Sequence, residues 1–141
     1  MSVTALIDSG ESDIDISVEY TMPSSVLYYG MLMFRRQDTT HYWNAYLGRD
    51  NAAPYIELTL VNGTSTSKGK VNVTHTLNQV NKLRVVAKGN SIKVYFDQYG
   101  TDPIIDITDS TFNDKTIVGL AGYKNENYLY CPADNFIVKP S

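Results

Sequence analysis

Three observations in the sequence predict an all-β fold. Residues that favour a pleated surface dominate, with 12 Val, 10 Ile, 13 Thr and 11 Tyr against 7 Ala and 4 Glu. Several segments alternate apolar and polar side chains, and turn residues separate them at the short spacing typical of a sandwich or barrel. The 141 residues suffice for one hydrophobic core, so we expect a single domain over residues 1–141.

The first half of the chain contains the longest predicted strands. Residues 13–21 alternate strictly, which predicts a half-buried strand. Residues 26–36 are almost continuously apolar, which predicts a central strand covered on both faces. Gly30 within this run predicts a bulge or the close approach of another side chain. Two further strands are expected at residues 41–47 and 55–61.

The remaining strands are shorter and are separated by clear turn signals. Asn62-Gly63 and Gly89-Asn90 predict tight hairpins, because both central residues tolerate positive φ. Polar residues 63–69 are expected to form a loop at the first hairpin. Including the first half, we expect roughly ten to twelve strands, of which the later ones lie at 71–73, 83–87, 92–96, 104–107, 117–123 and 135–138.

Charge and cysteine content exclude several function classes. The formal net charge is −3 and the densest basic run is Arg35-Arg36, which argues against a nucleic-acid groove. The single Cys131 excludes an internal disulfide, and with two His it also excludes the common zinc patterns. Residues 1–10 lack the features of a secretion signal, and no apolar run is long enough for membrane insertion. We therefore expect a protein made in the cytoplasm.

Six segments carry a resemblance to a known family, namely residues 30–38, 41–43, 81–97, 109–112, 118–121 and 133–136. In order and spacing they resemble the concanavalin A-like jelly-roll superfamily, and within it the laminin G-like modules common in bacterial and phage proteins. The resemblance covers nearly the whole chain. It implies an antiparallel jelly-roll β-sandwich of two sheets, one of them concave and often used to bind saccharide. This sandwich also serves glucanases, capsid components and spacers, so function must be argued from sites.

Acidic residues near the N-terminus suggest two kinds of site. Alternation places Glu11, Asp13 and Asp15 on one strand face, similar to the signature of laminarinase-type glucanases. The second catalytic Glu of that signature is absent, so we expect no hydrolase. In related sugar-binding sandwiches a calcium ion often ties the first strand to the last, which makes Glu11, Asp13 and Asp134 candidate calcium ligands. The alternatives are a solvated acidic strand face and, for Asp134, a turn cap.

Aromatic and planar polar side chains give the stronger indication of a ligand site. Sugar rings stack on aromatic faces while amide and charged groups bind the hydroxyls. The candidate ligand-binding residues lie on two segments expected to be neighbours and on a later loop; they are Tyr29, Arg35, Tyr42, Trp43, Tyr46, Asn125 and Tyr128. The alternative is that these aromatic residues belong to the core or to a contact between subunits.

These sites predict a non-enzymatic, lectin-like binding and assembly module on the surface of a phage virion, as a decoration, fibre or tail adhesin protein. Phage structural proteins are made in the cytoplasm and act outside it. Such a protein can have an adhesion-type fold without a secretion signal. The expected partners are glycan, other virion proteins and further copies of the chain. Two alternatives remain open: a virion protein with no ligand, and a carbohydrate-binding module of a secreted bacterial enzyme at the extracellular surface.

Overall fold

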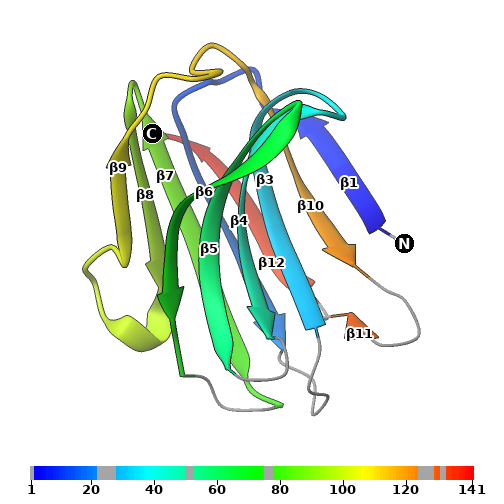
Figure 1. Ribbon diagram of the computed structural model, residues 1–141, viewed down its shortest axis with the longest axis vertical. Coiled ribbons are helices and arrows are strands. Elements are labelled where there is room, and N and C mark those ends of the chain that lie inside the picture. Colours follow the sequence, from blue (N-terminus) through cyan, green and yellow to red (C-terminus); the bar gives the residue numbers. More distant parts are fainter. Residues whose placement is uncertain (1, 22–27, 50–52, 75–77, 124–128, 131–132) are drawn as a thin grey trace.

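The computed structural model is a sandwich of two β-sheets (Figure 1). It describes residues 2–21, 28–49, 53–74, 78–123, 129–130 and 133–141. A short 3-10 helix, η1 (Asp97–Tyr99), follows the eighth strand. The strands in chain order are β1 (Ser2–Asp8), β2 (Ile14–Thr21), β3 (Tyr28–Asp38), β4 (His41–Arg49), β5 (Pro54–Asn62), β6 (Thr64–Asn72), β7 (Val80–Lys88), β8 (Ser91–Phe96), β9 (Ile105–Thr108), β10 (Ile117–Tyr123), β11 (Leu129–Tyr130) and β12 (Ala133–Pro140). The all-β prediction is confirmed.

The strand order places β3 in the middle of the larger sheet, as the apolar run predicted. The order in this sheet is β1-β10-β3-β4-β5-β6, with β11 also paired to β3. The smaller sheet has the order β12-β2-β7-β8-β9. Within the described ranges the short β11–β3 pair is parallel and every other pair is antiparallel. No helix in the described part of the chain could span a membrane.

The core between the sheets is built from alternate side chains of facing strands. In the smaller sheet β2, β7 and β8 each turn their apolar residues inward, and β4 and β5 do the same in the larger sheet. Each fully buried aliphatic or aromatic side chain contributes roughly 1.5–3 kcal/mol to folding. Prominent members of the cluster are Ile14, Ile16, Val18, Phe34, Trp43, Leu47, Ile56, Leu58, Val85, Val94 and Phe96.

Gly30 sits where a side chain from the opposite sheet crosses the core. A Cβ added to Gly30 would lie 2.8 Å from Cε1 of Tyr20. The Tyr20 hydroxyl donates a 2.9 Å hydrogen bond to the carbonyl of Met31, so the buried ring is held in place. The predicted close approach at Gly30 is therefore confirmed, and it joins β2 to β3 across the two sheets.

Two edge strands differ from the sequence expectation. Residues 63–69, expected as a loop, lie mostly in β6, which pairs with β5 along its length. Residues 2–8, for which no strand was predicted, form β1 at the other edge and pair with β10. The side chains of β6 are largely exposed, so polar residues there lose no contact with water on folding. The segment therefore lacks the apolar–polar alternation from which a strand is predicted.

Candidate functional site

The outward side of the larger sheet carries a band of polar and aromatic side chains across β4, β5 and β6. On β4 and β5 they alternate with the core-facing residues, and the register places Asn44 opposite Thr59 and Tyr46 opposite Glu57. We call this band the polar–aromatic face; it consists of Tyr42, Asn44, Tyr46, Tyr55, Glu57, Thr59, Ser67 and Lys70.

Asn44 and Thr59 form the fixed centre of this face. The Thr59 hydroxyl donates a 2.7 Å hydrogen bond to Oδ1 of Asn44. Both side chains are nearly buried, at 6% and 4% exposed, although they point away from the core. The Nδ2 group of Asn44 donates to no other residue in the described ranges. One side of the amide is therefore anchored, while the other keeps two hydrogen-bond donors for a ligand.

The tyrosines of the face are positioned by their neighbours. The Tyr46 hydroxyl donates to Oε1 of Glu57, and the Ser67 hydroxyl donates to the other oxygen at 3.2 Å. The rings of Tyr46 and Tyr55 meet edge to face at 5.8 Å, and Nζ of Lys70 lies 4.1 Å from the centre of the Tyr55 ring. Both predicted ligand residues Tyr42 and Tyr46 lie on this face, and both are half-buried.

Trp43 was predicted as a ligand residue, and the structure corrects this. Its side chain is fully buried, lies 6.1 Å from the Phe34 ring in a stacked arrangement, and donates a 2.8 Å hydrogen bond from Nε1 to the carbonyl of Thr111. The reason is strand alternation, because Trp43 shares the inward side of β4 with Ala45 and Leu47.

Arg35 was also predicted as a ligand residue, and it too lies in the core. Its φ of 47° belongs to a bulge that gives β3 one extra residue relative to β10. The buried guanidinium donates to the carbonyls of Ser12 at 3.2 Å and Gly89 at 2.8 Å, and lies 3.6 Å from Asp13. Arg36 therefore faces outward instead, and sequence analysis missed it because the bulge has no signature there.

The other predicted ligand residues are not tested by the structure. Tyr29 contributes its backbone to β3, opposite Gly48 of β4. Asn125 and Tyr128 lie outside the described residues.

The three residues predicted as calcium ligands do not come together in the structure. Asp134 pairs with Glu19 at one end of β2, whereas Asp13 precedes the other end, about 20 Å away at the rise of a strand. Asp13 accepts a 2.8 Å hydrogen bond from the Gly89 amide, Asp134 accepts one from the Asn135 amide, and Glu11 is exposed. Among the described residues no cluster of three or more His, Cys, Asp or Glu could hold a metal ion.

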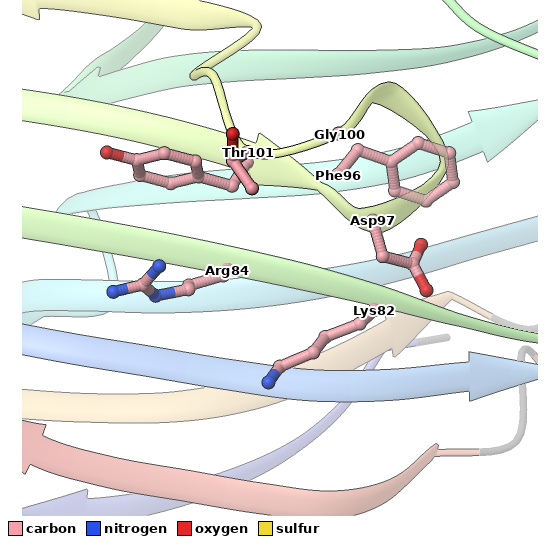
Figure 2. Close-up of a pocket in the computed structure, with 7 residues that line it drawn as sticks. Lys82, Arg84, Phe96, Asp97, Gly100 and Thr101 are labelled. Carbon is pink, nitrogen blue, oxygen red and sulfur yellow. The ribbon is translucent and has the colours of Figure 1, made fainter.

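The outward side of the smaller sheet holds a pocket whose arginine is already paired with a carboxylate. Lys82 and Arg84 of β7 border it on one side and Gly100 and Thr101 on the other (Figure 2). Arg84 donates two hydrogen bonds to Asp15, at 2.9 and 2.8 Å, and these lower the pKa of Asp15. The same guanidinium lies 5.0 Å from the centre of the Tyr95 ring. Because Arg84 is engaged on both sides, this pocket is a weaker candidate than the polar–aromatic face.

Comparison with known proteins finds similar folds among solved structures. No family model and no curated protein sequence matches the chain. Among solved structures, carbohydrate-binding module CBM66 from Bacillus subtilis has a TM-score of 0.65 at 16% identity, covering 99% of this chain and 79% of its own. Sheep galectin-11 in complex with glycerol has a TM-score of 0.69 at 8% identity, covering 97% and 96%.

A third similar structure comes from a phage. The CBM2 module of the evolved Dit protein of Lactobacillus casei BL23 phage J-1 has a TM-score of 0.61 at 13% identity, covering 86% of this chain and 59% of that one. At these identities the likeness establishes the fold, a concanavalin A-like jelly-roll sandwich, and the predicted architecture is confirmed.

Proposed function

We propose that this chain is a lectin-like module that binds glycan on the polar–aromatic face of the larger sheet and catalyses no reaction. The observation that carries the proposal is the Asn44 amide on β4, between Tyr42 and Tyr46. Thr59 fixes its oxygen, and its Nδ2 group has no hydrogen-bond partner among the residues that the structure describes. Tyrosine rings stack on the C–H faces of sugars, and an oriented amide donates to their hydroxyls. Carbohydrate-binding modules and galectins of the same fold support this proposal.

The single carboxylate of this face favours binding over hydrolysis. Retaining glycosidases need two carboxyl groups about 5 to 5.5 Å apart. Glu57 is the one carboxylate of the polar–aromatic face, and both of its oxygens accept hydrogen bonds, from Tyr46 and Ser67. Such a carboxylate is suited to orienting the neighbouring hydroxyls.

The proposal includes a location and partners. We place the module on the surface of a phage virion, as a decoration, fibre or tail adhesin protein that assembles with virion proteins or with copies of itself. The family resemblance of the sequence and the similar fold of a phage Dit module support this placement. Immunogold labelling of intact virions with an antibody against the chain tests this placement, and we expect label on the particle surface. Detection of the chain only as part of a secreted bacterial enzyme would contradict the placement.

A glycan array followed by calorimetric titration tests the binding function. We expect the full chain to bind at least one oligosaccharide, and Tyr42→Ala to weaken that binding about tenfold, or about 1.4 kcal/mol. Asn44→Asp keeps the acceptor for Thr59 but removes the donor, so it should weaken binding too. Tyr95→Ala, which removes a tyrosine from the opposite side of the sandwich, is the matched control and should bind like the unaltered chain.

The binding proposal fails if the array is silent or if Tyr42→Ala binds as well as the unaltered chain. Urea unfolding of each variant separates a lost contact from a lost fold, because Tyr42 is only half-buried and its replacement should leave the unfolding midpoint nearly unchanged.

A further inference from the structure

A pocket adjoins the polar–aromatic face on the outward side of the larger sheet. The register places Met31 and Met33 of β3 beside Tyr46 and Asn44, and Leu6 of β1 beyond them next to Gly119. Tyr42 belongs to both the face and the pocket, so the two are continuous. The pocket is lined by Leu6, Met31, Met33, Arg36, Thr39, Tyr42 and Ala121.

The floor of this pocket is apolar and closely packed. Met33 and Ala121 are each only 7% exposed, whereas Leu6 is 43% exposed. Leu6 leans over Gly119, where an added Cβ would lie 2.7 Å from its Cδ2 atom. Methionine side chains are polarisable and adapt to the shape of a bound group. The floor is therefore suited to a methyl group or to the C–H face of a sugar.

Arg36 places a positive charge at the rim of this apolar floor. In the described part of the chain no carboxylate oxygen lies within 4.0 Å of its guanidinium nitrogens. Asp38, two residues further along β3, accepts hydrogen bonds from Thr40 and His41, and Asp8, which pairs with Ile117 on the strand next to Arg36, accepts one from Thr116. The charge of Arg36 is thus available to an incoming group.

We infer that the glycan bound by this module is anionic, with its negative group on Arg36 and a neighbouring apolar substituent on Met31 and Met33. The inference rests on the proposed glycan-binding function and adds the class of ligand. A guanidinium binds planar carboxylates and phosphates through paired hydrogen bonds, and such bonds are about twice as strong as neutral ones. An acidic sugar carrying an acetyl or ketal methyl group fits both parts of the pocket.

The test compares acidic glycans with their uncharged counterparts on the full chain. The panel contains neutral oligosaccharides, sialyl and uronic acid oligosaccharides, the methyl esters of these acids, and phosphorylated oligosaccharides of the teichoic type. We expect at least one acidic class to bind about tenfold more tightly than its uncharged counterpart, with an affinity that falls as salt rises. The class that binds identifies the anion as carboxylate or phosphate.

Arg36→Gln is the decisive variant and Lys93→Gln, on the outward side of the smaller sheet, is its control. The preference for acid and its salt dependence should disappear in Arg36→Gln and persist in Lys93→Gln. A preference that survives Arg36→Gln, or equal binding of acids and esters, overturns the inference while the proposed glycan binding stands. Binding to no member of the panel overturns both.

Discussion

The indole Nε1 of Trp43 donates a 2.8 Å hydrogen bond to the backbone carbonyl of Thr111, which ties β4 to the segment between β9 and β10. Trp43→Ala should therefore lower the free energy of unfolding by about 3–5 kcal/mol, because it leaves a cavity and an unpaired carbonyl. Trp43→Phe retains much of the ring and should cost less. Urea unfolding monitored by circular dichroism measures both. An unchanged midpoint for Trp43→Ala would contradict a core role.

The contact of Tyr20 with Gly30 predicts a second sensitive position. Gly30→Ala should lower the free energy of unfolding by about 1–3 kcal/mol, since the new methyl group would meet a buried ring at 2.8 Å. In Tyr20→Leu, which removes the ring, the same glycine substitution should cost less. A double-mutant cycle measured by chemical denaturation gives this difference. Strict additivity would show that the ring is not the obstacle.

The same substitution should have a large effect on stability at Arg35 and a small one at the adjacent Arg36. Arg35→Gln leaves the carbonyls of Ser12 and Gly89 without a guanidinium donor, and should lower the free energy of unfolding by about 1–3 kcal/mol. Arg36→Gln should change it by less than about 0.5 kcal/mol, because Arg36 is only half-buried and forms no ion pair among the described residues. Thermal unfolding of the two variants side by side provides the measurement, and equal losses would contradict the bulged geometry.

The hydrogen bonds from Arg84 to Asp15 should make stability depend on pH in the acid range. They lower the pKa of Asp15 in the folded chain below its ordinary value of 3.8. Such a carboxylate stabilises the fold above about pH 4, the pKa of the unfolded chain, and this contribution is lost as pH falls through the folded pKa. Asp15→Asn should therefore be less stable than the unaltered chain at pH 6.

The difference between the two chains should shrink below pH 4. Urea unfolding of both at pH 6, 4 and 3 measures it, and Arg84→Gln should remove the same pH dependence. A difference that stays constant from pH 6 to pH 3 would contradict this role of the pair.

The sequence predicted elements wherever one face of a strand is buried. The strands β2 and β10 each turn apolar side chains toward the core, so their sequences show alternation or an apolar run. They correspond to the predicted strands at residues 13–21 and 117–123. The edge strand β6 escaped prediction because its side chains are exposed. Trp43 could have been placed in the core, since the alternation with Ala45 and Leu47 is visible in the sequence.

The site was less predictable than the fold, because it depends on register and on a bulge. Tyr42 and Tyr46 were predicted from their chemistry, and the structure places both on the polar–aromatic face. Asn44 gains its importance only from Thr59, a partner that lies opposite it on another strand. Arg36 was missed because simple alternation after Phe34 assigns the outward position to Arg35. The positive φ of Arg35 turns Arg35 inward and Arg36 outward, and no sequence pattern predicts it.

The extra residue that β3 carries relative to β10 determines which way the two arginines face. A chain shortened by one arginine here would match the register of β10, although β3 would still be one residue longer than β4. Its remaining guanidinium would directly follow Phe34, on the outward side of the strand. The carbonyls of Ser12 and Gly89 would then lose their donor, although every strand could still form. With both arginines present, Arg35 donates to two backbone carbonyls inside the sandwich while Arg36 places a positive charge on its surface. Neither arginine could do both.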